Sequence, residues 1–310
     1  MTTFTSTREY DLFGPWVDEV PGPSDIPRLY RDHAIDFASA RLVLKVPRNI
    51  DRRDATPDMD LYDHLLIAGP DALQVLSRAT PTRKRGPAGS STYTSREVTY
   101  TDIVAIHDSV NLLDATLTIT GRDASVVSVH YNGSAAKPIT ALVDVVRSTF
   151  KAGHPLDAAP ISARAPLGER DAALMVDFKN AARRLPGLTP LAWHERRTLR
   201  PLQAGLAGLA RRVALVGSRA TLHGAILGAD DVAIEAFGRR EWIVRGRAPE
   251  LSSGRLVVPT ATLDAVEFSA HPDYAGVAAV TFKSGAARTT MHVPEDSDAL
   301  AVLTGAFSNG

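Results

Sequence analysis

The densest group of cationic side chains is Arg83, Lys84 and Arg85, which stand between Pro81 and Gly86. Each adjacent cation can contribute about 1 kcal/mol of attraction at an anionic membrane surface. The same charges also suit an exposed loop in which they serve only solubility. We treat the three residues as a candidate anion-binding site and the plain surface loop as its alternative.

Carboxylates and one histidine gather upstream of this loop. Arginine alternates with aspartate from residue 48 to 60. A metal or phosphate site would explain this pattern, but surface charges that pair with one another explain it more simply. Asp58, Asp60 and Asp63 with His64 have the chemistry of hard metal ligands. Because apolar residues alternate with these carboxylates, the face of a strand is the favoured interpretation, and no metal site is assigned.

The other histidines are scattered. His130 and His292 are each flanked by apolar residues, which favours half-buried strand positions over a catalytic pair. His194 follows Trp193 in the sequence LAWHERR, and this pair is the candidate for a cleft between domains. The alternative is that both residues anchor an interface.

Local motifs of catalysis are missing from the sequence. There is no GxSxG, HExxH, GxxxxGK[ST] or GxGxxG pattern, and there is no cysteine. We therefore assign no catalytic, cofactor-binding or metal-binding residue and expect no cofactor, although a site built from distant residues would leave no such motif.

Composition restricts the partners. Lys plus Arg and Asp plus Glu both number 35, so no net charge draws the chain to nucleic acid, and none is expected as a partner. The most apolar stretch, residues 202–217, contains Arg211 and Arg212 and is not expected to span a bilayer. Without a signal-peptide pattern, the expectation is a cytoplasmic protein that is at most peripheral at a membrane.

Periodicity defines the elements that must position these residues. Alternating apolar residues predict strands, two of which are joined by a tight turn at Gly69, Pro70 and Asp71. They are followed by one amphipathic helix over 134–150, whose apolar stripe is Ile139, Leu142, Val143, Val146 and Phe150. The predicted strands cover residues 42–46, 64–68, 72–77, 96–100, 102–108, 115–121 and 124–131. Further helices are predicted over 170–185 and 199–213.

The chain then repeats this order. Gly69 and Asp71 correspond to Gly228 and Asp230, and the later strands and a final helix ending at Phe307 follow in the same sequence. This predicts a duplicated module. The boundaries are an N-terminal docking arm over 1–40, a first domain over 41–152, a helical connector over 153–217 and a second domain over 218–310. In the arm, Tyr10, Phe13 and Trp16 are expected to anchor the chain on a folded body, and Ser24 is expected to cap a short helix through Asp32.

Seven short strands and a closing helix resemble the pleckstrin-homology (PH) superfold, and the two halves resemble tandem bacterial PH-like domains. The segments FGPWVDEV and LVLKVPRNIDRRDATPDMDLYDHLL also resemble stretches of actinobacterial proteins of unknown function. The resemblance implies an α+β fold with two small β-barrels or orthogonal sandwiches, each capped by a C-terminal helix. It also implies cationic residues on an early loop, the place that Arg83, Lys84 and Arg85 occupy.

The expected function is that of a non-catalytic binding or scaffold protein. Its modules would present loops or sheet edges to a protein, a peptide or, more weakly, an anionic lipid head group. Two alternatives stay open: an enzyme with an interdomain active site near His194, and a self-assembling structural protein whose exposed sheet edges pair between chains. Neither the ligand nor the oligomeric state follows from the sequence.

Overall fold

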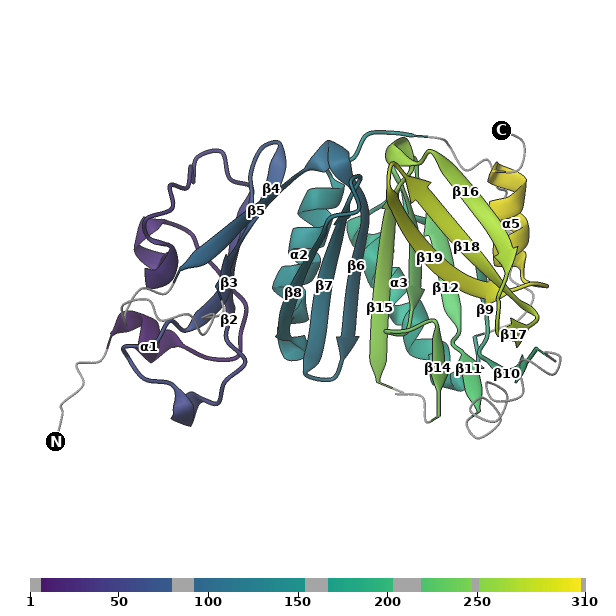
Figure 1. The fold of residues 1–310 in the computed structure, drawn as a ribbon, viewed down its shortest axis with the longest axis horizontal. Helices are drawn as coiled ribbons and strands as arrows, with labels where there is room; N and C mark the ends of the chain where they lie inside the picture. Colours follow the sequence, from purple (N-terminus) through teal and green to yellow (C-terminus); the bar gives the residue numbers. More distant parts are fainter. Residues whose placement is uncertain (1–6, 80–91, 154–166, 203–218, 247–250, 308–310) are drawn as a thin grey trace. The chain divides into compact units, whose positions relative to one another are not determined.

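The computed structural model describes residues 7–79, 92–153, 167–202, 219–246 and 251–307 (Figure 1). The chain divides into two compact units. Unit 1 comprises residues 1–102, 112–118 and 127–149, and unit 2 comprises residues 103–111, 119–126 and 150–310. Within the described residues, no helix has the length and apolar character needed to cross a membrane.

The fold is α+β, with mostly antiparallel sheets and few helices. The elements up to residue 147 are α1 (Arg8–Leu12), β1 (Asp18–Glu19), β2 (Leu42–Pro47), β3 (Tyr62–Ala68), β4 (Ala72–Arg78), β5 (Tyr93–Thr99), β6 (Ile103–Asn111), β7 (Asp114–Gly121), β8 (Val126–Asn132) and α2 (Ala136–Arg147). The later helices are α3 (Ala172–Arg184) and α5 (Asp298–Phe307). The later strands are β9 (Thr189–His194), β10 (Arg197–Pro201), β11 (Ala220–Leu222), β12 (Ala225–Ala229), β13 (Ala233–Gly238), β14 (Ile243–Arg245), β15 (Ser252–Pro259), β16 (Ala265–Ala270), β17 (Tyr274–Ala275), β18 (Val277–Ser284) and β19 (Ala287–Pro294).

These strands form four sheets. Their orders are β1-β2-β3-β4-β5, β8-β7-β6-β15-β13-β12-β9, β14-β11-β10-β17 and β16-β18-β19. The expected barrels are not observed, because the sheets of the described residues are open and none closes on itself.

Local sequence explains the elements. In β7, alternate residues Ala115, Leu117 and Ile119 are buried while the threonines between them are more exposed, which is the period of a half-buried strand. The predicted stripe of α2 is buried, so that amphipathic helix is confirmed. The helix ends at Arg147, so Phe150 lies beyond it, contrary to expectation.

The order of elements occurs twice. The strands β2 to β5 pair consecutively, and β9, β12, β13 and β15 pair in the same antiparallel way. A 3-10 helix follows each set, η4 (Tyr100–Asp102) and η8 (Thr260–Thr262). Three strands and a helix come after η4, and the same number come after η8 once the two-residue strand β17 is set aside. The strands after η4 are β6 to β8 with α2, and those after η8 are β16, β18 and β19 with α5.

We call β2 to β8 with α2 the first series and β9 to β19 with α5 the second. The strand β6 of the first series pairs with β15 of the second. In unit 2, β6 pairs antiparallel with β15, with Asp108 opposite Arg255 and Ile106 opposite Val257. The outer edge of β15 is thus covered by β6.

Two expectations need correction. The connector over 153–217 is not simply helical: α3 confirms the helix predicted over 170–185, but β9 and β10 follow it. Because β9 pairs with β12, residues 189–194 extend a sheet instead. The helix predicted over 199–213 starts inside β10, and residues 203–213 lie outside the described part.

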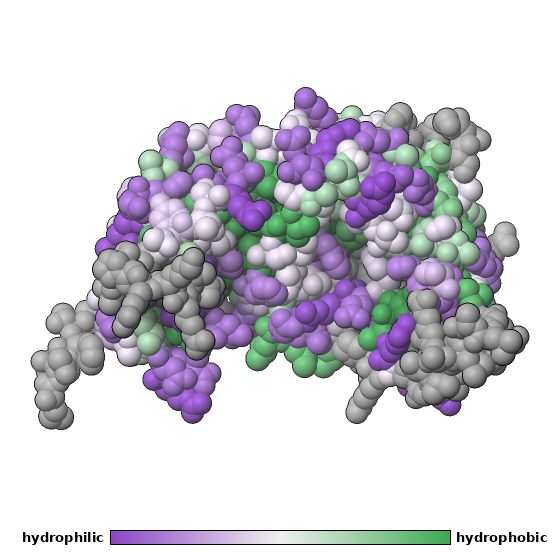
Figure 2. Space-filling view, in the orientation of Figure 1, coloured by the Kyte–Doolittle hydropathy of each residue, from purple (hydrophilic) through white to green (hydrophobic). Residues whose placement is uncertain are grey.

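The N-terminal segment packs on unit 1 through fewer aromatic residues than expected. Phe13 is buried in the core and Tyr10 packs beside it, whereas Trp16 is exposed. The helix expected between Ser24 and Asp32 is replaced by two 3-10 turns, because Pro27 interrupts it. Elsewhere, the face drawn in Figure 2 mixes hydrophilic and hydrophobic residues.

Candidate functional site: a polar cavity in unit 1

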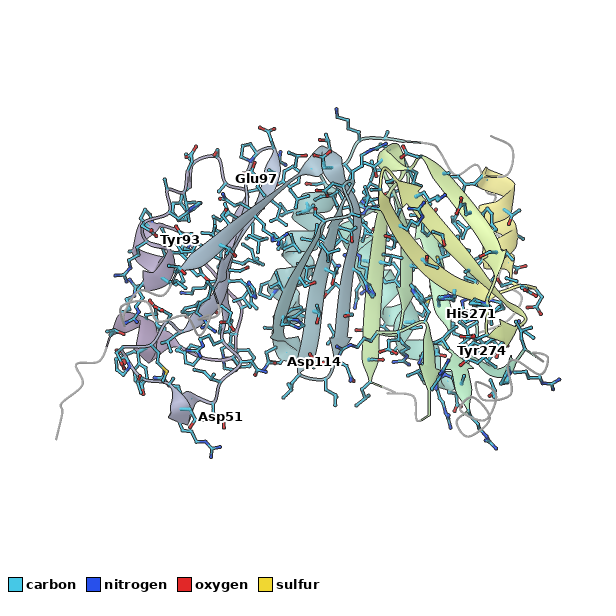
Figure 3. The ribbon with its side chains drawn as sticks, in the orientation of Figure 1. Asp51, Tyr93, Glu97, Asp114, His271 and Tyr274 are labelled. Carbon is cyan, nitrogen blue, oxygen red and sulfur yellow. The ribbon has the colours of Figure 1, made fainter. Side chains whose placement is uncertain are left out.

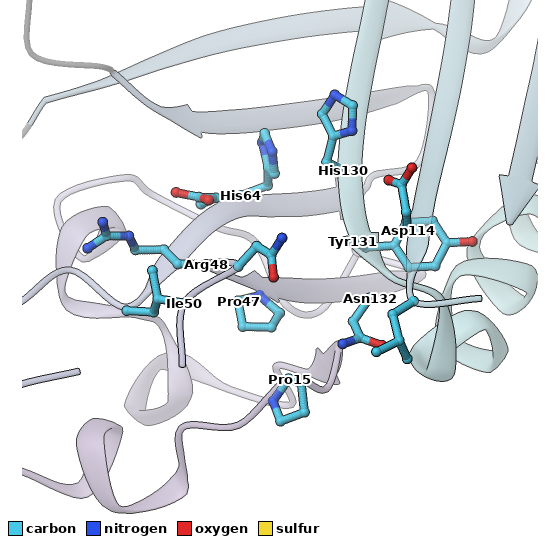
Figure 4. Close-up of a pocket in the computed structure, with 12 residues that line it drawn as sticks. Pro15, Pro47, Arg48, Ile50, His64, Asp114, His130, Tyr131 and Asn132 are labelled. Carbon is cyan, nitrogen blue, oxygen red and sulfur yellow. The ribbon is translucent and has the colours of Figure 1, made fainter. Parts of the chain in front are cut away.

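Unit 1 contains a cavity of about 460 Å³ (Figure 4). This volume lies in the range of small-molecule sites, which is about 300–1,000 Å³. Eight of the twelve lining residues are polar, and the lining comes from separate parts of the sequence. Its residues are Pro15, Pro47, Arg48, Asn49, Ile50, Asp63, His64, Leu113, Asp114, His130, Tyr131 and Asn132.

Strand ends bring these residues together. A register irregularity lies between Val46 and Pro47, Pro47 makes the last pair of β2 with β3, and the chain that follows supplies residues 48–50. Asp63 and His64 lie at the start of β3, and residues 130–132 lie at the end of β8. In Figure 4, Arg48 and His64 lie on one side of the cavity, and Asp114 and Tyr131 lie on the other.

His64 contributes a neutral imidazole. Its Nδ1 lies 2.9 Å from Ser77 Oγ on the paired strand β4. Burial lowers the pKa of His64 to about 4, because the charged imidazolium loses solvent there. The ring is therefore uncharged near pH 7 and can donate or accept one hydrogen bond at each nitrogen, depending on the tautomer.

Other polar groups of the lining are held by their neighbours. Arg78 lies 2.7 Å from Asp63 in an ion pair, and the Nδ1 atom of His130 lies 3.1 Å from Thr116 Oγ1. The Oδ1 atom of Asn132 accepts a hydrogen bond of 3.0 Å from the backbone N–H of Ser134. The lining is thus partly fixed before any ligand arrives.

The balance of charge selects the ligand chemistry. Two carboxylates, Asp63 and Asp114, face the cavity together with one guanidinium, that of Arg48. Asp63 is already paired with Arg78, and the other two charges, those of Arg48 and Asp114, are of opposite sign, so a phosphate would meet no excess of positive charge. Imidazole, carboxamide and carboxylate groups suit instead a small polar molecule without net charge.

Unit 2 holds a buried ion centre. Asp171, just before α3, accepts hydrogen bonds from Arg196 Nη2 at 2.9 Å and Arg239 Nη2 at 3.0 Å. Burial alone would raise the pKa of Asp171, but the hydrogen bonds and charges of the two arginines hold it below its ordinary value. The carboxylate therefore stays ionised and serves as an anchor for two cations.

The candidate pair Trp193 and His194 lies near this centre. His194 is 5% exposed, and its Nδ1 lies 3.3 Å from the carbonyl oxygen of Glu195. Its Nε2 has no hydrogen-bond partner among the described residues, and burial lowers its pKa to about 4. Trp193 packs against the cluster that contains Leu174 and Phe178. These contacts are those of a packed interior.

The remaining candidates are dispersed. Arg83, Lys84 and Arg85 lie outside the described residues. In the stretch over 48–60, Arg53 pairs with Asp51 at 2.9 Å on the surface, and Asp60 pairs with Arg28. His64 enters the cavity lining with Asp63 but not with Asp58 or Asp60, and the described residues contain no group of three or more potential metal ligands.

His130 and His292 occupy the last strands of their series, β8 and β19. The ring of His292 lies 5.0 Å from that of His271, centroid to centroid, and burial lowers the pKa of His292 to about 4. His271 lies beside Tyr274 (Figure 3). His130, by contrast, lines the cavity.

Sequence reasoning identified His64 and His130 separately but missed their shared site. No local pattern marked Asp114 or Asn132 as a residue of a binding site, since Asp114 follows a turn and Asn132 precedes a helix. An Asn before the helical stretch indicates a helix cap, which Asn132 provides. Its place in a cavity depends on which strands meet.

Comparison with known proteins gives no relative: no protein-family model, no curated protein and no solved structure matches this chain. The functional argument therefore starts from the geometry of the chain itself.

Proposed function

We propose that the chain is a non-catalytic binding protein built from two PH-like modules, and that the cavity of unit 1 holds a small polar ligand without net charge. The observation that carries this proposal is the cavity itself, with a neutral imidazole among groups of both charge signs.

The repeated order of elements supports the PH-like part of the proposal. Four antiparallel strands, a 3-10 turn, three strands and a helix occur in this order in each half, and the second half carries β10, β11, β14 and β17 in addition. A PH-like module is an open pair of sheets with one terminal helix, which this order would produce. The pairing of β6 with β15 suits a scaffold, because backbone hydrogen bonds then link strands from both series.

The composition of the lining supports binding over catalysis. His64 hydrogen-bonds to a serine, and Asp63 pairs with Arg78, so these neighbours do not form an oriented acid–base pair. Recognition needs only convergent polar groups and a concave surface, and both are present.

An anionic head group remains the second proposed ligand, at Arg83, Lys84 and Arg85. The cavity would not take it, because two carboxylates line that site. Replacing the three cations together by alanine should weaken binding to vesicles containing phosphatidylserine, while vesicles of phosphatidylcholine serve as the neutral control. Unchanged binding to both vesicle types would remove this version.

The test of the cavity is calorimetric titration with free amino acids, monosaccharides and inorganic phosphate. We expect heat of binding from a neutral or zwitterionic probe, none from phosphate, and no chemical change in the bound compound. The variant His64→Phe should lose binding, whereas Ser77→Ala, which alters only the partner of His64, should retain most of it. Binding that is equal in wild type and His64→Phe would place the ligand elsewhere.

A further inference from the structure

Corresponding strands of the two series have different neighbours. In unit 2, β15 pairs with β13 on one side and with β6 on the other, and most of its residues are buried. Its counterpart β5 pairs with β4, and no strand of the described residues pairs with its outer edge. Four consecutive residues of β5, from Thr94 to Glu97, are exposed.

The strand that follows each 3-10 helix differs in the same way. Five of the nine residues of β6 are buried and the others are half-buried, and its residues 106–111 pair with β15. Its counterpart β16 pairs with β18 and ends its sheet, and none of its residues is fully buried. The chain therefore carries one completed junction, β15 with β6, and the two halves of a second such junction, β5 and β16.

We propose that β5 of one copy of this chain pairs antiparallel with β16 of a second copy, repeating between molecules the junction that β15 and β6 make within one. An unpaired edge presents backbone N–H and C=O groups that another strand can satisfy. The partner is a second copy because the chain itself contains a strand that corresponds to the one seated on β15.

Charge fixes one register. With Arg96 opposite Glu267, Tyr93 lies opposite Ala270 and Val98 opposite Ala265, so all of β16 is paired. This places an arginine opposite a carboxylate, as Arg255 lies opposite Asp108 in the existing junction. Opposite charges on directly facing residues stabilise a strand pair, and like charges destabilise it.

The side chains at this register are available. The side chain of Arg96 makes no hydrogen bond or ion pair within the described residues. The side chain of Glu267 forms an ion pair with Lys283 and is still 57% exposed. Glu97, the residue after Arg96, is labelled on β5 in Figure 3. This register can be compared with that of β15 and β6 if β5 is aligned with β15 at η4 and η8, and β16 with β6 at their first residues. The two registers then differ by two residues. An even shift keeps every side chain on the same face of the sheet.

The contact joins two different edges, so it is heterologous and leaves one β5 and one β16 edge open on each pair. Association should therefore rise with concentration and extend beyond dimers or close into a ring. It involves none of the residues that line the cavity of unit 1, so its success or failure is independent of ligand binding there.

The test is sedimentation velocity of the full chain over a concentration series. Wild type should associate, and Arg96→Glu and Glu267→Arg should each lower the association constant by about tenfold or more, because like charges then face each other. The double variant Arg96→Glu with Glu267→Arg should restore association. An equimolar mixture of the two single variants should also associate, because the altered β5 of one variant and the altered β16 of the other carry opposite charges at the facing positions.

The control is Arg53→Glu, an exposed charge reversal in a 3-10 helix remote in sequence from both strands, which should sediment as wild type. Circular dichroism verifies that each variant is folded. A wild type that stays monomeric up to about 1 mM would overturn the proposal. Association that survives both single charge reversals, or a double variant and a mixture that both fail to associate, would also overturn it.

Discussion

Asp171 and Arg239 form an ion pair in the interior of unit 2, with Oδ1 and Nη2 3.0 Å apart and side chains 2% and 4% exposed. Arg239 also donates to the carbonyl oxygens of Ser252 and Arg170, and Arg196 binds the same carboxylate. The pair thus connects the residue before α3 to the residue before β10, the residue after β13 and the first residue of β15.

Replacing Asp171 by alanine should lower the free energy of unfolding by about 3–5 kcal/mol, because two buried or half-buried guanidinium groups lose their partner. Urea denaturation measures this change. Asp296→Ala is the matched control: Asp296 pairs with Arg197 on the surface, and its loss should cost less than about 1 kcal/mol. Equal losses of unfolding free energy in the two variants would show that the ion pair of Asp171 and Arg239 is not shielded from solvent.

Four buried or half-buried histidines make the fold sensitive to acid. Burial lowers the pKa values of His64, His194, His223 and His292 to about 4, from an ordinary value near 6.5. Between these values the unfolded chain binds protons that the folded chain does not, so stability falls as the pH drops from about 6.5 towards 4.

At pH 5, unfolding should take up about three to four protons from this group. Urea denaturation over pH 4–7 gives that number from the slope of the unfolding free energy against pH. The variant His64→Gln should reduce the uptake by about one proton. A slope that His64→Gln leaves unchanged would mean that His64 titrates at its ordinary pKa in the folded protein.

Gly228 in β12 is required by close packing. A Cβ atom there would lie 2.7 Å from Phe178 Cε2 and 3.0 Å from the carbonyl oxygen of Thr189. Gly228→Ala should therefore destabilise the chain by about 1–3 kcal/mol. Gly168→Ala, whose Cβ meets nothing within 4 Å, should change stability by less than about 0.5 kcal/mol. Thermal unfolding of both variants compares the two positions, and equal melting temperatures would contradict this packing.

Much of the fold follows from local patterns. The alternation in β7 and the stripe of α2 depend only on neighbouring residues, and the turn at Gly69 joins β3 to β4 as predicted. The strand β9 was missed because Pro190 and the surrounding prolines suggested a connector. It is an edge strand, where proline is tolerated.

The ion centre and the cavity depend on residues that are far apart in the sequence, so they were harder to predict from it. Asp171 and Arg239 are 68 positions apart, and each alone looks like a surface charge. His64 and His130 were visible as single residues, yet the cavity exists only because the start of β3 and the end of β8 both contribute to it. No local pattern encodes such a meeting.

The most direct measurement of the ligand site is the ¹⁵N NMR spectrum of the histidine side chains during titration with free amino acids and monosaccharides. A ligand in the cavity should shift the signals of His64 and His130, while His271 and His292 in unit 2 serve as the internal reference. We predict saturable shifts confined to the first pair. Shifts at the second pair alone, or no shift at about millimolar ligand, would contradict the proposed site.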